Sequence, residues 1–169
     1  MKRVLLLGLV IAAVTAGAQT RSPTSTGSAP ASGPVAAPAG LPPEALRSSI
    51  EGHLGRPYVW GSSGLKSFDC SGYVWRVLWE NGILMKRTTA RKLYMVLPKV
   101  SEADRWSFGN VVFFDNRKHC GIVASHDTFY HAQTSTGTNL SRFDPLWRRK
   151  ICGIRTLPRQ AARDTTKDD

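Results

Sequence analysis

The sequence predicts an α+β domain in which N-terminal helices pack on an antiparallel β-sheet. Between residues 43 and 97, apolar side chains recur at the three-to-four-residue spacing of helices that bury one face. From Gly109 onward the pattern changes to short apolar runs separated by turn residues, which is typical of strands joined by tight connections. Helices first and strands second is the order of an α+β domain rather than of alternating parallel units.

The predicted helices begin and end at residues that favour helix ends. Asp69 is a good N-cap because its side chain can accept a hydrogen bond from a free backbone N–H of the first turn. Thr88 or Thr89 can cap a third helix in the same way, and Pro98 ends it. The helices are expected near residues 43–55, 70–81 and 89–97.

Short apolar runs predict the strands. We expect them at residues 111–114, 120–123 and 128–132, with another beginning near Leu140 and a last one at 151–157. Because short turns separate the first three, an antiparallel meander is the simplest arrangement.

Composition divides the chain into four segments. A basic start, an apolar run at residues 4–14 and the small residues Ala16-Gly17-Ala18 are typical of a secretory signal peptide over residues 1–18. We expect cleavage near Ala18 and export to the periplasm, the cell envelope or the medium. Residues 19–42, rich in Ser, Thr, Pro, Ala and Gly, predict a disordered linker. The folded domain then covers 43–157, and 158–169 form a polar, disordered tail.

The charge of the chain favours anionic partners without choosing one. The 169 residues carry 23 Lys and Arg against 12 Asp and Glu, a formal net charge of +11. The basic residues are scattered and form no nucleic-acid-binding motif, so nucleic acid is not an expected partner. No segment after the signal peptide is apolar enough to span a membrane. The oligomeric state stays open, with a monomer as the simplest expectation.

Cys70 is the candidate nucleophile. It follows the N-cap Asp69 and a glycine-rich stretch, so it stands in the first turn of a helix. Free backbone N–H groups and the helix dipole there can lower a cysteine pKa from about 8.5 to roughly 3.5–7.5. The alternative is a small buried cysteine that happens to follow a cap.

His119 and His131 are the candidate partners of that thiol. A short turn separates their strands, and a turn with an odd number of residues places both imidazoles on one face, either opposite each other or as diagonal neighbours. A one-residue shift would place them on opposite faces. On one face, one imidazole could deprotonate Cys70 while the other holds its tautomer.

These residues occur within a longer series of motifs. In chain order they are Tyr58-Val59-Trp60-Gly61, Phe68-Asp69-Cys70-Ser71-Gly72, Gly109-Asn110-Val111-Val112-Phe113-Phe114, His119-Cys120-Gly121-Ile122 and Tyr130-His131-Ala132. The series resembles that of the NlpC-type cell-wall cysteine peptidases, a papain-like family, over residues 44–156.

The resemblance implies a papain-like α+β fold and hydrolysis of peptidoglycan stem peptides, typically between the side-chain carboxyl of D-glutamate and a diamino acid. It implies that Cys70 is the nucleophile, His119 its base and His131 the residue that orients the base. Tyr58 resembles a pocket residue beside the nucleophile, where its hydroxyl could help the Cys70 N–H hold the oxyanion. Asp69 and Ser71 match positions that help receive the N-terminal end of the stem. Neither a metal nor another cofactor is implied.

Three departures from the family pattern stand out. Asn110 replaces a usual Asp. Cys120 replaces a usual Val; alternation along the strand points it away from His119, and we interpret it as a core residue. The odd number of cysteines, three, leaves at least one free thiol. A Cys120–Cys152 disulfide stays open. The basic stretch from Arg87 to Lys92 stands where the family often continues with Gln, so we expect its contacts with the substrate to differ from those of the family.

Other functions compete with a peptidoglycan endopeptidase. The chain could be a non-catalytic wall-binding module of the same fold, or an amidase or toxin-type hydrolase acting on a different bond. A metal site formed by Cys70, His119 and His131 is disfavoured because the cysteine has no CxxC-type partner.

Overall fold

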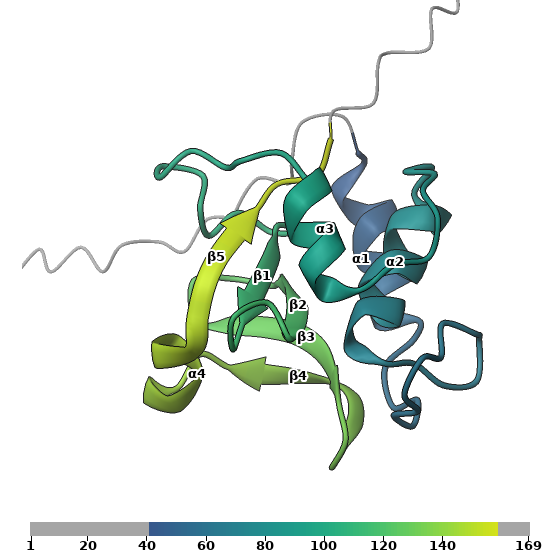
Figure 1. Ribbon diagram of the computed structural model, residues 1–169. Helices are drawn as coiled ribbons and strands as arrows, with labels where there is room; N and C mark the ends of the chain where they lie inside the picture. Colours follow the sequence, from purple (N-terminus) through teal and green to yellow (C-terminus); the bar gives the residue numbers. More distant parts are fainter. Residues whose placement is uncertain (1–40, 159–169) are drawn as a thin grey trace, which may run out of the picture. The chain divides into compact units, whose positions relative to one another are not determined.

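The computed structural model describes residues 41–158 (Figure 1). The predicted signal peptide and almost all of the predicted linker and tail lie outside these residues. Within the described part of the chain, no helix has the length and hydropathy needed to cross a lipid bilayer. In chain order the elements are α1 Pro43–Glu51, α2 Cys70–Glu80, α3 Ala90–Val96, β1 Val111–Phe114, β2 His119–Val123, β3 Thr128–Gln133, β4 Gly137–Arg142, α4 Pro145–Lys150 and β5 Ile151–Arg155.

The strands form one antiparallel sheet in the order β4-β3-β2-β1-β5. β1 to β4 follow one another as a meander, and β5 returns to the other edge to pair with β1. α2 packs on β2 and β3, and α1 and α3 pack on α2 (Figure 1). The predicted α+β class and the antiparallel meander are confirmed.

Alternating side chains give the sheet two different faces. The helix face packs against α1, α2 and α3 and shares their core; the sheet contributes Val111, Phe113, Cys120, Ile122, Tyr130 and Ala132 to it. The aromatic face is the opposite one and has its own smaller core, made of Val112, Phe114, Val123, Phe129, Phe143 and Ile154. Trp147 of α4 packs against this second core.

Two elements on the aromatic side depart from the prediction. β4 begins at Gly137 rather than near Leu140, because Thr138 also bonds to the segment between α1 and α2: its N–H donates to the carbonyl of Arg56 at 2.8 Å. Gly137 itself has φ +70°, and a Cβ there would lie 2.1 Å from that same carbonyl oxygen. α4 was not expected; it is short, with Asp144 as its N-cap accepting from the N–H of Trp147.

The turn of the β2–β3 hairpin has the odd number of residues that places both candidate histidines on one face of the sheet. Gly121 pairs with His131, and Val123 pairs with Phe129, which leaves an odd number of residues in the turn. His119 and His131 are therefore diagonal neighbours on one face, the aromatic face. Gly121 makes this possible, since a Cβ there would lie 3.1 Å from the Cβ of His131 and 2.6 Å from the carbonyl of Tyr130.

Candidate active site

Cys70 is the first residue of α2, as predicted. The Asp69 carboxylate caps the helix by accepting from the N–H of Gly72 at 2.6 Å. Gly72 allows the preceding loop to lie against the helix, since a Cβ there would meet the carbonyl oxygen of Ser62 at 2.0 Å. The loop and the cap thus hold the sulfur at the helix tip, and Cys70 as a residue is 6 % exposed.

The Asp69 carboxylate is already fully engaged. Arg87 donates to both of its oxygens, each at 2.6 Å, and the N–H of Gly61 donates at 2.8 Å. The Ser71 hydroxyl donates to the same carboxylate at 2.9 Å and accepts from Arg87 at 3.1 Å. Asp69 and Ser71 do lie at the pocket, but a substrate ammonium at Asp69 would have to compete with the Arg87 guanidinium, whose Nη2 contacts both carboxylate oxygens.

The two predicted imidazoles are in direct contact. Nε2 of His119 lies 2.9 Å from Nδ1 of His131, and Nε2 of His131 lies 2.9 Å from the Ser141 hydroxyl. Trp147 packs on both rings, with centroids 5.5 Å from His119 and 5.0 Å from His131. His131 is fully buried, whereas His119 is half-buried.

The hydrogen bonds beyond His131 determine its tautomer. The Ser141 hydroxyl donates to Oδ1 of Asn139 at 2.8 Å, so it can only accept from Nε2–H of His131. Nδ1 of His131 then has no proton and accepts from Nε2–H of His119. This leaves Nδ1 of His119 as the nitrogen free to take a proton from a thiol.

Burial keeps His131 neutral. Desolvation, together with the charge of His119, lowers the pKa of His131 to about 3. A neutral His131 accepts a hydrogen bond from His119 and orients it without carrying charge itself.

The start of β2 lies beside the Cys70 sulfur. The thiol lies 3.9 Å from the carbonyl of Lys118, the residue before His119. A hydrogen bond from the Cys120 side chain is the largest cause that lowers the pKa of Cys70 to about 5. Burial opposes this shift, and a hydrogen bond and charge from His119 add to it. A thiol with this pKa carries a negative charge at neutral pH.

Cys120 has the opposite character. It is fully buried on the helix face, as expected of a core residue, and burial raises the pKa of its thiol well above the usual value. A neutral Cys120 can donate its S–H to the Cys70 thiolate, a contact that the sequence did not reveal. All three cysteines are free, so the Cys120–Cys152 disulfide left open by the sequence is not formed.

Tyr58 stands near the thiol in a protonated state. Burial, with the charges of Cys70 and Asp69 added, raises the pKa of its phenol. A phenol that keeps its proton at neutral pH can donate a hydrogen bond to a developing negative charge.

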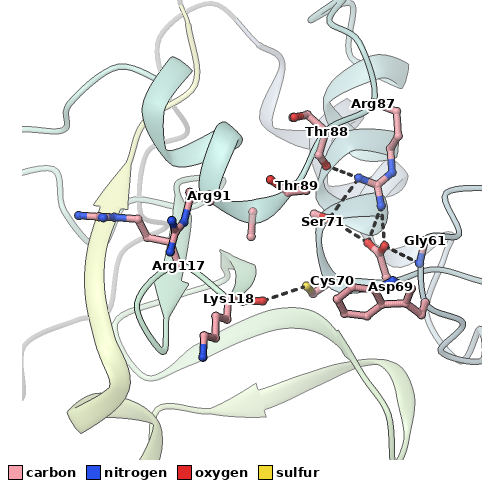
Figure 2. Close-up of a pocket in the computed structure, with 12 residues that line it drawn as sticks. Gly61, Asp69, Cys70, Ser71, Arg87, Thr88, Thr89, Arg91, Arg117 and Lys118 are labelled. Carbon is pink, nitrogen blue, oxygen red and sulfur yellow. Dashed lines mark hydrogen bonds and ion pairs between the residues drawn. The ribbon is translucent and has the colours of Figure 1, made fainter.

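A pocket of about 700 Å³ opens at the sulfur (Figure 2). Its lining comes from the glycine-rich loop, the tip of α2, the start of α3 and the β1–β2 turn: Trp60, Gly61, Asp69, Cys70, Ser71, Arg87, Thr88, Thr89, Ala90, Arg91, Arg117 and Lys118. The nucleophile candidate is thus accessible to a substrate from one side.

Several residues of this site carried no signal in the sequence. Ser141, a residue of β4, orients His131, and Trp147, a residue of α4, packs over both imidazoles. A serine in a strand and a tryptophan in a short helix have many roles, so only their position identifies these. Arg87 belongs to the basic stretch identified in the sequence. Its bond to Asp69 forms because the fold places the segment before α3 against the first turn of α2, which the sequence pattern does not specify.

Comparison with known proteins gives consistent similarities. The family model described as the NlpC/P60 family matches residues 55–156. "Probable endopeptidase p60" of Listeria seeligeri is 38% identical over 84 residues, which cover 48% of this chain and 16% of that protein. "Probable peptidoglycan endopeptidase LytE" of Bacillus subtilis is 30% identical over 115 residues, which cover 65% of this chain and 33% of that protein. The chain thus spans a third or less of the length of these curated relatives.

The fold has solved counterparts. A crystal structure titled as similar to a lipoprotein of the NLP/P60 family, from Staphylococcus aureus, superposes with a TM-score of 0.63 at 24% identity. The match covers 73% of this chain and 44% of that one. At this identity the likeness concerns the fold.

Proposed function

The chain belongs to the NlpC/P60 family and has the papain-like α+β fold of its domains; from this and from the geometry around Cys70 we propose that it is an exported peptidoglycan hydrolase. In this proposal it is a cysteine endopeptidase that cleaves stem peptides between the side-chain carboxyl of D-glutamate and a diamino acid. One observation carries the proposal: a thiol with a pKa of about 5 interacts with an imidazole that a second, neutral imidazole orients.

The proposed reaction is acyl transfer in two steps. The Cys70 thiolate attacks the scissile carbonyl, and the tetrahedral oxyanion accepts hydrogen bonds from the Cys70 N–H and the Tyr58 hydroxyl. Donors of this kind typically contribute about 10²–10³ in rate. Protonated His119 gives its proton to the leaving amine, and a thioester remains on Cys70. Water, deprotonated by His119, then hydrolyses the thioester and restores the thiol–imidazole pair.

Three residues act in support of this chemistry. His131 fixes His119 with Nε2–H pointing away from the sulfur, so that Nδ1 is the nitrogen that exchanges the proton. Asp69 and Ser71 are assigned to the end of the pocket that receives the N-terminal end of the stem. Because Arg87 occupies the carboxylate, Asp69 contributes there mainly by holding the helix tip and its loop.

Digestion of purified sacculi tests the proposal. We expect the wild-type chain to release stem-peptide fragments and the Cys70→Ala variant to release none while it keeps its circular dichroism spectrum. Equal release by the variant would refute cysteine catalysis. Mass analysis of the fragments identifies the bond, and products of another bond would support the amidase or toxin-type alternative.

Thiol labelling separates an enzyme from a wall-binding module. Cys70 should react with iodoacetamide well below pH 8, with the rate rising through pH 5 as the thiolate forms. Cys152, which is exposed, is removed by Cys152→Ser so that the signal reports on Cys70. A rate that rises only near pH 8.5, together with intact binding to sacculi, would favour the module.

A further inference from the structure

The pocket at Cys70 has two ends of different charge. At one end, Asp69 and Arg87 form an ion pair that is neutral overall, with Nη2 of Arg87 donating to both carboxylate oxygens. At the other, Arg91 from α3 and Arg117 and Lys118 from the β1–β2 turn line the pocket. Figure 2 shows Arg91 and Arg117 close to each other on the side opposite Asp69, with Cys70 between the two ends. We refer to Arg91, Arg117 and Lys118 as the cationic end.

The cationic end has no acidic partner among residues 41–158. Asp115 is the nearest carboxylate along the chain, but it pairs with Lys150 at 3.5 Å. The pocket lining holds four cationic side chains and one carboxylate, a net charge of +3. Uncompensated charges of one sign around a recess attract an anionic group.

Arg117 is held in place by a strained turn and an aromatic ring. Asp115, Asn116 and Arg117 all have positive φ, at 49°, 50° and 67°. Three successive non-glycine residues in this region cost of the order of 1 kcal/mol each, and such strain is concentrated at binding and catalytic sites. The Arg117 guanidinium lies over the Tyr94 ring at 4.4 Å, so its N–H edge is left for other contacts.

The Arg117 side chain also keeps an unused donor. Its Nε has no hydrogen-bond partner among residues 41–158, but this atom is itself buried, so a contact with a ligand would fall to the terminal N–H groups of the guanidinium. A planar guanidinium with free donors matches a carboxylate better than it matches any neutral group. The turn and the stacking together indicate a guanidinium held in place at the pocket rather than a freely solvated charge.

We propose that the cationic end binds a carboxylate carried by the residue on the leaving side of the scissile bond. The inference rests on the proposed function, which places the N-terminal end of the stem at Asp69 and Ser71. A peptide that enters there and presents its carbonyl to Cys70 continues toward Arg91, Arg117 and Lys118. A diamino acid on the leaving side offers a carboxylate from its main chain or, in diaminopimelate, also from its side chain.

Binding to the Cys70→Ala variant tests the inference without turnover. The probes are alanyl-γ-D-glutamyl-lysine with a free carboxylate, the same peptide as its carboxamide, and the amide in which diaminopimelate replaces lysine. We expect the free acid to bind about 10- to 100-fold more tightly than the lysine amide, the range for a hydrogen-bonded charged group. The diaminopimelate amide distinguishes the two carboxylate sources. If it binds as tightly as the lysine peptide with a free carboxylate, a side-chain carboxylate is sufficient. If it binds as weakly as the lysine amide, the main-chain carboxylate is the group that the cationic end binds.

A matched set of variants localises the contact. The double variant Arg91→Gln with Arg117→Gln should remove the preference for the free acid over the amide, because it weakens the binding of only those peptides that carry the carboxylate. Lys92→Gln removes the same kind of charge from the next position of α3, but Lys92 lines a neighbouring recess and should leave the preference unchanged. Higher salt should reduce the preference, because Arg91 and Lys118 are exposed. Arg91→Gln alone, on an exposed helix position, covers the case in which the double variant does not fold.

The outcomes separate this inference from the proposed function. Equal affinity for acid and amide, no measurable binding of any probe, or a preference that the Arg91 and Arg117 variants retain would each overturn the inference. Carboxylate-selective binding by a chain that does not cleave sacculi would sustain the inference and overturn the proposed endopeptidase.

Discussion

The two faces of the sheet place the two kinds of reactive side chain in different surroundings. The thiols of Cys70 and Cys120 belong to the core on the helix face, whereas the imidazoles of His119 and His131 lie on the aromatic face against Trp147. His119 is the first residue of β2, where the strand begins beside the helix tip. The reactive groups of the two faces therefore meet at the end of a strand and not through the sheet.

Burial favours the uncharged form of a side chain on both faces, and its neighbours overcome this effect only at Cys70. On the aromatic face, desolvation of His131 is not compensated, and its pKa falls to about 3. On the helix face, desolvation alone would raise a thiol pKa, as it does for Cys120. Cys70 is lowered to about 5 instead, because Cys120 and His119 stabilise its thiolate. A hydrogen-bond donor at the right place thus matters more than depth of burial.

The connection between the faces can be broken at His119, which should give the largest effect. His119→Ala removes the proton acceptor, together with the hydrogen bond and charge that add to the effect of Cys120 in lowering the Cys70 pKa. We expect the rate of fragment release to fall about 10³-fold or more, the scale of a lost general base. Initial rates on solubilised stem peptides measure this. A variant that retains more than a tenth of the activity would show that the two faces are not coupled through this residue.

The aromatic face can be tested by itself at His131. His131→Asn keeps a polar side chain but cannot orient Nε2–H of His119 in the same way, and we expect about a 10²-fold loss in kcat with little change in KM. Unchanged kcat would mean that Trp147 alone holds the His119 ring.

The same variant gives a pH test of the buried imidazole. The His131 pKa is about 3 in the folded chain and 6.5 when exposed, so only the unfolded state takes up the proton as pH falls between these values. Stability is fully present above pH 6.5 and declines toward pH 3. Urea midpoints at pH 7 and pH 4.5 should differ less for His131→Asn than for the parent. Both are compared in a Cys70→Ala background, because the lowered thiol pKa also reduces stability as pH falls through about 5.

The helix face gives the smallest and most specific effect. Cys120→Val introduces an apolar side chain of similar size and removes the S–H that donates to Cys70. We expect the labelling profile of Cys70 to move to higher pH, with a several-fold slower rate at pH 6 and a nearly unchanged rate at pH 8. A profile that does not move would show that His119 alone lowers the thiol pKa. Cys152→Ser, remote from this core and exposed, is the control.

Local chemistry in the sequence was sufficient for the α+β class, the Asp69 cap and the placement of Cys70 in the first turn of α2. It was also sufficient for the parity of the β2–β3 turn, because side-chain alternation along a strand depends on residue count alone. These features involve residues that are neighbours in the chain, so pattern and spacing specify them. The roles of Cys70, His119, His131, Tyr58, Asp69 and Ser71 in catalysis and binding stay predictions for the experiments above.

Only the tertiary structure decided what surrounds those residues. The bond from Arg87 to Asp69, the support of His131 by Ser141 and the donor that Cys120 presents to Cys70 each join residues from different helices, strands or loops. The gathering of Arg91, Arg117 and Lys118 at one end of the pocket is of the same kind. A sequence pattern records which groups are available; whether a thiol is charged or a carboxylate is free depends on which distant groups the fold brings within a few ångströms, because hydrogen bonds and desolvation act only at that range.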